Sequence, residues 1–393
     1  MFLRSLDSAK IDQKKVLLRV DFNVPFDKGK ILDDFRILNV LPTIKWLKEK
    51  KAAKIILVSH LGQPNGKDLK YSLKPVADYL EKTMKEKVYF LTLPIGNELL
   101  KEIDKLPFGS VILLENIRFY KEEQENDKNF AKDLAKMADC FINEAFSVSH
   151  RQVASLCAIT EFLPFYPGKL LEKEISNLDR VSKNPAKPLV VILGGAKIKD
   201  KLPLIEKFLV KADYILLGGV MANTILKSLD FSIGQSLFEE ITEEINLSGF
   251  QGAELILPGD FVVLDKAGKK QKRELGKVLE KDKILDIGPI ASHTFSKIIS
   301  KAKTIFWNGP MGKFEDKRFR DGTNEIIKAI IKNKNAFSVI GGGETMASFK
   351  EVEPNIKTLE TTSQIFFSTG GGASLEYLAG KSLPGLKALS NNK

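Results

Sequence analysis

Cysteine and long apolar runs are scarce in this chain of 393 residues, and each scarcity excludes a class of protein. The two cysteines, Cys140 and Cys157, form no CxxC pair, which argues against a disulfide framework or a zinc site. No stretch reaches the roughly 18 apolar residues of a membrane span, and the first residues lack the apolar region of a signal peptide. We therefore expect a cytoplasmic protein with no membrane partner.

Composition and charge narrow the class further. With 43% apolar and 28% charged residues the chain is globular rather than disordered, and its length favours two domains. The net charge is +11; 27 cations face 23 anions up to Gly168 (+4), and 34 face 27 after it (+7). An excess this diffuse suits an anionic small molecule, weak nucleic-acid binding or solubility alone, so its location matters more than its size.

Short apolar runs alternate with longer charged segments of helical period in both halves. In the first half the expected strands are Val16–Val20, Ile55–Ser59, Val88–Leu91, Val111–Leu114 and Cys140–Asn143. In the second half they are Leu189–Leu193, Tyr214–Leu217, Thr304–Trp307, Phe337–Ile340 and Gln364–Ser368. These runs are apolar throughout, as strands covered on both faces are, so the sequence predicts an α/β protein with two doubly wound parallel sheets.

Two proline-containing breaks mark the boundary between the halves. Leu163–Gly168 and Lys183–Pro188 interrupt the chain, and a charged stretch of helical character, from about Lys169 to Ser182, lies between them. We interpret this stretch as an interdomain helix or hinge over residues 169–184. The expected domains are then residues 1–168 and 185–376.

The residues that follow the expected strands differ between the halves. In open α/β sheets ligands bind beyond the carboxyl ends of the strands. In the first half these positions are polar or cationic: Asp21, Asn23, His60, Arg118, His150 and Arg151. In the second half they are glycines: Gly194-Gly195, Gly218-Gly219, Gly309 and Gly312, Gly341–Gly343 and Gly370–Gly372. One half is typical of a site for a charged, hydroxylated small molecule, and the other lets a polyphosphate approach backbone N–H groups.

Each signal also has an ordinary structural interpretation. A glycine pair can simply form a turn, a surface arginine or lysine can pair with a carboxylate, and a histidine can be structural. Asp21 and Asn23 lie on one face of an extended segment, which suits hydroxyl recognition or a turn. Lys197 and Lys201 are spaced i,i+4 at a helix start, and Glu344 is either a Mg²⁺ ligand or a carboxylate favoured at a helix N-terminus. Neither a P-loop nor a complete G-x-G-x-x-G motif occurs.

Longer motifs, taken in order, closely resemble the phosphoglycerate kinase family nearly from end to end. They are Arg19–Pro25, Ser59–Gly62, Leu114–Phe119, His150-Arg151, Leu193–Lys197 with Asp200-Lys201, Trp307–Pro310, Gly341–Gly343 and Ser368–Ser374. The resemblance implies two Rossmann-like domains joined by a helical hinge, with residues 377–393 packing back onto the first. It also implies a monomer that binds 3-phosphoglycerate or 1,3-bisphosphoglycerate on one domain and Mg-ADP or Mg-ATP on the other, with no tightly bound organic cofactor and no specific nucleic acid.

The resemblance also assigns roles to matching residues. Those implied to hold the glycerate are Asp21, Asn23 and His60. Those implied to bind its non-transferring phosphate are Arg118, His150 and Arg151. The groups implied at the transferring phosphoryl group, and hence in catalysis, are Arg36, Lys201 and the amides of Gly371 and Gly372. The nucleotide is implied to contact Lys197, Lys201, Gly218, Gly219, Asn308, Gly312, Glu315, Gly341, Gly342, Gly343, Glu344 and Thr345, with Glu344 at the metal.

Two departures from the family pattern are visible. The family usually reads His-Leu-Gly-Arg-Pro-Lys-Gly where this chain has Gln63 and Asn65 in place of the two cations. A lost charge-assisted phosphate contact costs about 1.5–3 kcal/mol, which predicts weaker phosphoglycerate binding unless Lys67 substitutes. The usual aspartate after the triple glycine is Glu344, whose reach is one methylene longer, so the metal geometry is expected to differ.

The predicted activity is the reversible transfer of the acyl phosphate of 1,3-bisphosphoglycerate to ADP, in glycolysis and gluconeogenesis, by in-line transfer after domain closure. Such a reaction needs positioning and charge neutralisation rather than a protein nucleophile. Two alternatives remain. One is an inactive homologue that binds a nucleotide or a nucleic acid. The other is a related kinase or ligase that acts on a different carboxylic acid, for which Gln63 leaves room.

Overall fold

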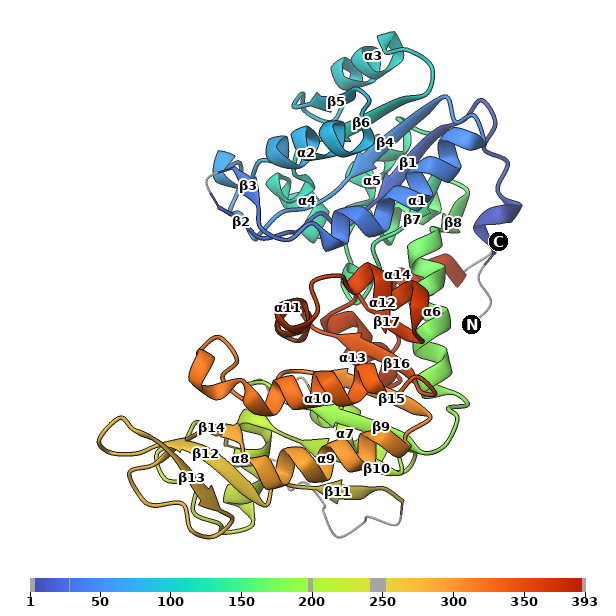
Figure 1. Cartoon of the computed structure of the whole chain (residues 1–393). Coiled ribbons are helices and arrows are strands. Elements are labelled where there is room, and N and C mark those ends of the chain that lie inside the picture. The colour runs from blue at the N-terminus through green and yellow to red at the C-terminus, as the bar shows by residue number, and fades with distance from the viewer. Residues whose placement is uncertain (1–3, 28, 197–200, 241–251, 391–393) are drawn as a thin grey trace. The chain divides into compact units, whose positions relative to one another are not determined.

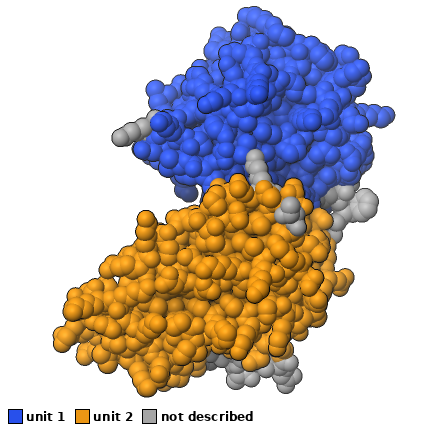
Figure 2. All heavy atoms as spheres, in the orientation of Figure 1, with its two compact units in different colours: residues 1–175, 382–393 blue, residues 176–381 orange. Residues whose placement is uncertain are grey.

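The structure, a computed structural model, describes residues 4–27, 29–196, 201–240 and 252–390. The chain forms two compact units, shown in different colours in Figure 2. Unit 1 comprises residues 1–175 and 382–393, and unit 2 comprises residues 176–381. The boundary falls within one helix, α6 (Lys169–Ser182), which matches the helical stretch expected between the two breaks.

Unit 1 contains a six-stranded sheet in the order β5-β6-β4-β1-β7-β8, in which every pair is parallel (Figure 1). Its strands are β1 (Lys15–Arg19), β4 (Lys54–Val58), β5 (Val88–Leu91), β6 (Ser110–Leu114), β7 (Cys140–Asn143) and β8 (Phe165–Pro167). The helices of this unit are α1 (Phe35–Glu49), α2 (Lys74–Met84), α3 (Asn97–Lys105), α4 (Lys121–Gln124), α5 (Lys128–Ala135) and α14 (Pro384–Ser390). Strand order reverses around β1, whose neighbours are β4 and β7, and such a switch point is where a ligand crevice opens.

Unit 2 contains a second parallel six-stranded sheet in the order β11-β10-β9-β15-β16-β17. Its strands are β9 (Leu189–Leu193), β10 (Tyr214–Leu217), β11 (Glu254–Ile256), β15 (Thr304–Asn308), β16 (Phe337–Gly341) and β17 (Ile365–Phe367). Its helices are α7 (Leu202–Leu209), α8 (Gly219–Ser228), α9 (Pro289–Lys301), α10 (Asp321–Lys332), α11 (Gly343–Val352), α12 (Ile356–Thr362) and α13 (Gly372–Leu378). An antiparallel sheet of β12 (Asp260–Leu264), β13 (Lys270–Glu274) and β14 (Lys283–Ile287) adjoins them.

The expected α/β class with two parallel sheets is confirmed, and all ten expected strands are present. The continuous apolar runs are buried as expected, and no residue of β4, β6 or β9 is exposed. The segment interpreted only as a break contains β8, which pairs with β7 at the sheet edge, where the missing N–H of Pro167 is tolerated. Also unexpected are the antiparallel sheet and a two-stranded ribbon of β2 (Phe26–Asp27) and β3 (Lys30–Ile31).

The C-terminal segment that clusters with unit 1 begins at Ser382. Within it the Gly385 N–H donates a hydrogen bond to the Ser149 carbonyl at 2.8 Å. Tyr377 belongs to α13 in unit 2, and its hydroxyl donates to Asp179 Oδ1 at 2.7 Å. Among the described helices none combines the length and apolar character that crossing a membrane requires.

Candidate active site

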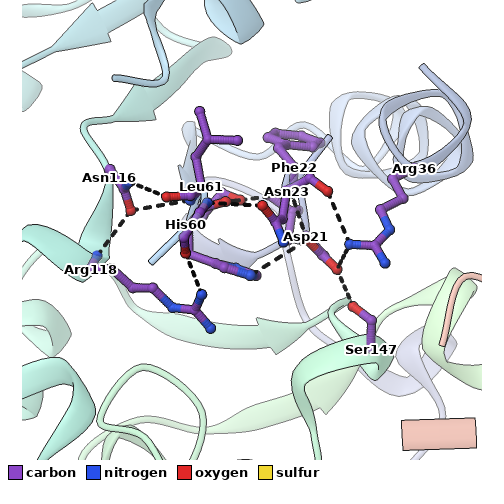
Figure 3. Close-up of polar contacts among 12 residues, drawn as sticks. Asp21, Phe22, Asn23, Arg36, His60, Leu61, Asn116, Arg118 and Ser147 are labelled. Carbon is purple, nitrogen blue, oxygen red and sulfur yellow. Dashed lines mark hydrogen bonds and ion pairs between the residues drawn. The ribbon is translucent and has the colours of Figure 1, made fainter. Parts of the chain in front are cut away.

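In unit 1, Asp21 lies at the centre of a charged cluster beyond the end of β1, drawn in Figure 3. Its carboxylate accepts hydrogen bonds from Arg36 Nη1 at 2.7 Å, from the Asn23 N–H at 2.9 Å and from the Ser147 hydroxyl. Burial of the carboxyl opposes ionisation, but the charge of Arg36, together with His60 and these hydrogen bonds, lowers the pKa of Asp21 to about 2. Asp21 is therefore a fixed anion, and the Arg36 side chain, 31% exposed, remains open to a ligand.

His60 follows β4 and is 2% exposed. Its Nε2 lies 3.9 Å from Asp21 Oδ1, and its Nδ1 lies 3.4 Å from Arg19 Nη2. Burial, and then the charges of Arg19, Arg118 and Arg36, hold the pKa of His60 well below its usual value, and the opposing effect of Asp21 is too small to restore it. The imidazole is therefore neutral, with one nitrogen that donates and one that accepts.

The turn after β4 is held by Asn23 and Asn116. The Gly62 N–H donates to Asn23 Oδ1 at 2.9 Å, and the Gly62 carbonyl accepts from Arg118 Nη1 at 2.5 Å. Asn116 is fully buried and binds this turn through the Leu61 N–H and carbonyl, at 3.2 and 2.8 Å. Gly62 has φ +61°, and a Cβ there would lie 2.3 Å from the Tyr71 ring, so glycine is required.

The second cationic group comprises Arg118, in the short helix η3 (Ile117–Phe119) after β6, and His150 and Arg151, past the short helix η4 (Phe146–Val148) after β7. Arg151 is exposed, whereas Arg118 is half-buried. Burial, with the neighbouring charges of Arg19 and Arg151, lowers the pKa of Arg118 to about 10, so it stays cationic at neutral pH. His150 is half-buried and follows Ser149, to which the C-terminal segment is hydrogen-bonded. Gln63, Asn65 and Lys67 are all exposed.

In unit 2 the glycine turns interlock through their backbones. The Gly195 N–H donates to the Pro310 carbonyl at 2.8 Å, and the Gly219 N–H donates to the Met311 carbonyl at 2.9 Å. A Cβ on Gly194 would lie 2.1 Å from the Pro310 carbonyl oxygen, and one on Gly309, at φ +94°, would lie 2.2 Å from the Gly194 carbonyl oxygen. Glycine is therefore required at Gly194 and Gly309 because the turns approach each other too closely for a Cβ, whether or not a ligand binds there.

A cavity of about 440 Å³ opens beside these turns. Among the residues expected at the nucleotide, those that line it are Gly219, Gly312, Glu315 and Glu344. Gly195 and apolar side chains such as Met311, Phe261 and Ile284 complete much of the wall. Its size and mixed lining suit a flat heteroaromatic ring with an attached polar group. Gly218 lies behind the wall, where a Cβ would be 2.6 Å from Met311 Sδ.

The side chains of Lys201 and Glu344 both lie close to Gly195. A Cβ on Gly195 would be 3.3 Å from Lys201 Nζ and 3.6 Å from Glu344 Oε2. Lys201 is 6% exposed, and its ammonium group donates to the Gly194 carbonyl. An ammonium group and a carboxylate therefore share the rim of the glycine turn. Lys197 lies outside the described residues.

The other residues expected at the nucleotide or at the transferring phosphoryl group differ in their exposure to solvent. Thr345 is fully buried, and its Oγ1 accepts a hydrogen bond from the Gly309 N–H at 2.7 Å. Asn308 is 6% exposed, and its Nδ2 would lie 3.4 and 3.1 Å from a Cβ on Gly341 and Gly342. Thus Thr345 and Asn308 support the glycine turns from behind. Around Gly343, Gly371 and Gly372 a Cβ would meet nothing within 4 Å, so these positions are open to a ligand.

Several residues that shape the two sites carried no assigned role in the sequence analysis. They are Arg19, Asn116 and Ser147 in unit 1 and Asp286 in unit 2. Arg19 and Asn116 lie inside motifs that were noted, but nothing in their spacing shows that they point inward. Asp286 accepts hydrogen bonds from the Gly322 and Ile287 N–H groups at 2.8 and 2.9 Å, and a Cβ on Gly312 would lie 2.4 Å from its Oδ1.

Comparisons with known proteins agree along the whole chain. The profile of a family described as phosphoglycerate kinase matches residues 6–381. A phosphoglycerate kinase of Dictyoglomus turgidum is 44% identical over 387 residues, 96% of each chain, and one of Coprothermobacter proteolyticus is 41% identical over 399 residues, 99% of each. The structure of phosphoglycerate kinase from Coxiella burnetii matches with a TM-score of 0.82 and 36% identity over 99% of both chains. The crystal structure of the enzyme from Pyrococcus horikoshii matches with a TM-score of 0.83, 33% identity and 98% coverage of both chains.

Proposed function

The chain belongs to the phosphoglycerate kinase family of glycolytic phosphotransferases with a carboxyl group as acceptor, and on that premise we propose how its residues divide the reaction. In this proposal unit 1 binds 3-phosphoglycerate or 1,3-bisphosphoglycerate and unit 2 binds the adenine nucleotide. The acyl phosphate moves to ADP in one direction, and the γ-phosphate of ATP moves to the carboxylate in the other. This assignment of one substrate to each unit rests on one observation. Unit 1 has a cluster of charged side chains, whereas unit 2 has interlocked glycine turns beside a cavity.

In unit 1 the fixed charges suit a phosphorylated hydroxy acid. The Asp21 carboxylate can accept a hydrogen bond, and the neutral His60 can donate one. This pair of groups suits the hydroxyl or carboxyl oxygens of a glycerate. Arg118, His150 and Arg151 form the patch for the phosphate that does not move, because guanidinium groups bind phosphate oxygens in pairs. Arg36 is held against Asp21 and reaches the phosphoryl group that does move.

In unit 2 the cavity takes the adenine ring and the glycine turns take the phosphates. Backbone N–H groups at the starts of α8, α11 and α13 are donors that an anion can approach closely because no Cβ intervenes. Gly218, Gly219, Asn308, Gly312 and Glu315 then surround or support the adenosine, and Gly341–Gly343 with Thr345 shape the phosphate turn. We assign Lys197 to the phosphate chain and Lys201 to the transferring group.

The residues fit a magnesium ion that is bound mainly by the nucleotide. Within the described part of the chain there is no group of three or more His, Cys, Asp or Glu residues placed to hold a metal. Mg²⁺ in kinases commonly uses one or two carboxylates, several waters and substrate phosphates, and Glu344 at the rim of the Gly195 turn supplies one carboxylate. When bound, the ion neutralises charge on the phosphate chain. No other cofactor is proposed.

Transfer needs positioned cations and N–H donors rather than a protein nucleophile. Charge on the oxygens of the moving phosphoryl group is neutralised by Arg36, Lys201 and the amides of Gly371 and Gly372. The attacking carboxylate is already ionised at neutral pH, so no general base is required. Because each unit binds one ligand, we also propose that closure about α6 brings them together and excludes water. Small-angle scattering with both substrates should show compaction, and an unchanged radius of gyration would contradict closure.

The assignment of Arg36 is tested by Arg36→Ala in a coupled ATP assay with 3-phosphoglycerate. We expect turnover to fall by roughly 10²-fold or more, as for other transition-state charge stabilisers, while titration of ADP is unchanged. The matched control is Arg318→Ala, because Arg318 is an exposed arginine that pairs with Asp316 on the surface of unit 2. Unchanged turnover in Arg36→Ala would contradict the assignment.

The same assay separates the alternatives. Wild-type activity on 3-phosphoglycerate excludes an inactive homologue, and activity only on another carboxylic acid would redirect the proposal to a related kinase. That the chain acts as a monomer, binds no specific nucleic acid and works in the cytoplasm stays a prediction. Sedimentation analysis of the purified protein tests the first of these.

A further inference from the structure

Arg19, at the end of β1, is a buried cation beneath the unit 1 site. It is 1% exposed, and its guanidinium donates through Nε to Ser155 Oγ at 2.8 Å and through Nη1 to the Val20 carbonyl at 2.5 Å. Its Nη2 lies 3.4 Å from His60 Nδ1 and 3.9 Å from Glu123 Oε1. The side chain therefore connects a buried carboxylate on one side to the imidazole of the site on the other.

The direction of each hydrogen bond in this network is fixed. A guanidinium has five N–H donors and no acceptor, so Ser155 Oγ must accept from Arg19. The Ser155 hydroxyl in turn donates to Glu123 Oε1 at 2.6 Å, and the Ser155 N–H donates to Glu123 Oε2 at 2.8 Å. Glu123, 1% exposed, is thus the acceptor at the end of the network and the counter-charge of Arg19.

The contact between Arg19 and His60 determines which imidazole nitrogen carries the proton. Arg19 can only donate, so Nδ1 of His60 must hold a lone pair. A doubly protonated imidazole would place two cationic donors against each other, which burial and the neighbouring charges of Arg118 and Arg36 also disfavour. The single proton therefore resides on Nε2, which lies 3.9 Å from Asp21 Oδ1. A ligand oxygen between these two groups meets one donor and one acceptor.

We propose that Arg19 is a positioning residue that sets the tautomer of His60, so that Nε2–H is presented as a donor to the glycerate. The inference rests on the proposed function only in naming the ligand. The tautomer itself follows from contacts within unit 1 and can be measured without substrate. Loss of the Arg19 donor would leave Nδ1 free to take the proton, and the site would then present two acceptors, His60 Nε2 and Asp21, to the same ligand oxygen.

The direct test is a ¹⁵N–¹H long-range correlation spectrum of the wild-type protein at neutral pH. The chain has only three histidines, so His60 is assigned by the signal that disappears in His60→Gln. We expect an unprotonated Nδ1 and a protonated Nε2. A protonated Nδ1, or an imidazolium, would overturn the proposal whatever the catalytic activity. Conversely, the expected spectrum in a protein inactive on 3-phosphoglycerate would contradict the proposed function and leave the tautomer assignment standing.

The role of Arg19 is tested by Arg19→Met combined with Glu123→Gln, which removes the donor without leaving an uncompensated buried carboxylate. We expect His60 to shift toward the Nδ1–H tautomer and the KM for 3-phosphoglycerate to rise roughly tenfold, with the KM for ATP unchanged. A retained Nε2–H tautomer would overturn the proposal. If this variant does not fold, the wild-type spectrum still decides the tautomer on which the proposal depends.

The matched control is Lys54→Met, which also removes a buried cation from unit 1. Lys54 begins β4, at the opposite end of the strand from His60, and its ammonium group donates to the carbonyls of Leu106 and Pro107. This variant should lose stability while the His60 signals and the KM for 3-phosphoglycerate stay as in the wild type. A change in the His60 tautomer here would mean that it responds to general destabilisation, which contradicts a specific role for Arg19.

Discussion

Replacing Asp21 by asparagine should make part of the acid sensitivity of unit 1 disappear. The pKa of Asp21 in the folded chain is about 2, against a reference value of 3.8, because the charge of Arg36 and the other contacts outweigh burial. A difference of this size corresponds to ~2 kcal/mol of folding free energy at neutral pH. Since the side chain is only 7% exposed, solvent does little to screen the interaction.

The sign of the pH dependence follows from the lowered pKa. A carboxyl that binds its proton more weakly in the folded state stabilises the fold at every pH above its unfolded pKa, and the contribution is lost as the pH falls toward about 2. By this linkage ~2 kcal/mol is present above about pH 5, and roughly half of it remains at about pH 3. The difference in unfolding free energy between wild type and Asp21→Asn should therefore shrink by ~1 kcal/mol between neutral pH and about pH 3.

Urea unfolding followed by tryptophan fluorescence can measure this change in unit 1 alone. The chain has two tryptophans, Trp46 in unit 1 and Trp307 in unit 2, so a Trp307→Phe background isolates the signal. The control is Asp68→Asn, because Asp68 is also in unit 1 and its pKa is also lowered, mainly by its hydrogen bonds with Lys70, but its side chain is 39% exposed. That variant should change stability much less. A difference for Asp21→Asn that stays constant or grows on acidification would refute the reasoning.

Three further predictions concern the same unit. Gly62→Ala should lower stability by about 1–3 kcal/mol in urea unfolding and raise the KM for 3-phosphoglycerate, because the new Cβ meets the Tyr71 ring at a positive φ; an unchanged KM would show that this turn does not shape the site. Burial raises the pKa of Glu144 from 4.5 to about 7, so wild-type stability should fall as the pH rises from 4.5 to about 7 while that of Glu144→Gln should not, and parallel pH profiles in urea unfolding would contradict this. Gln63→Arg should lower the KM for 3-phosphoglycerate about tenfold in the coupled assay by restoring a charged phosphate contact, and no change would mean that Lys67 or another cation already fills that role.

Much of the fold could be predicted because most of the parallel strands are short apolar runs that can be recognised in the sequence one at a time. The expected segments Cys140–Asn143, Leu189–Leu193 and Tyr214–Leu217 coincide with β7, β9 and β10, since each is a mainly apolar run that is largely buried. Strand β13 could not be found in this way. It belongs to a small antiparallel sheet, and its sequence, Lys-Gln-Lys-Arg-Glu, has no apolar residue.

The contacts that tune the site are not local, and this limits what the sequence could reveal. The positions after strands predicted Asp21 and His60 as site residues, and the family resemblance predicted Arg36. The hydrogen bond from Ser147 to Asp21 spans 126 residues, and that from Arg19 to Ser155 spans 136. No periodicity or spacing encodes such pairs, because they depend on which strands become neighbours around β1.

Net charge failed as a guide to the anion sites for a physical reason. In the proposed division unit 1 binds an anion with side-chain charges, but two of its cations are offset nearby: Arg19 by Glu123, and Arg36 by Asp21. A site can therefore contain several charged side chains while adding almost nothing to the net charge of the chain. Unit 2 presents backbone N–H groups of glycine turns, which carry no formal charge at all. The two sites differ in what orients their hydrogen-bond donors. In unit 2 close packing at the glycines orients the backbone N–H groups, and in unit 1 ion pairs orient the side chains. The net charge of the chain reports neither arrangement.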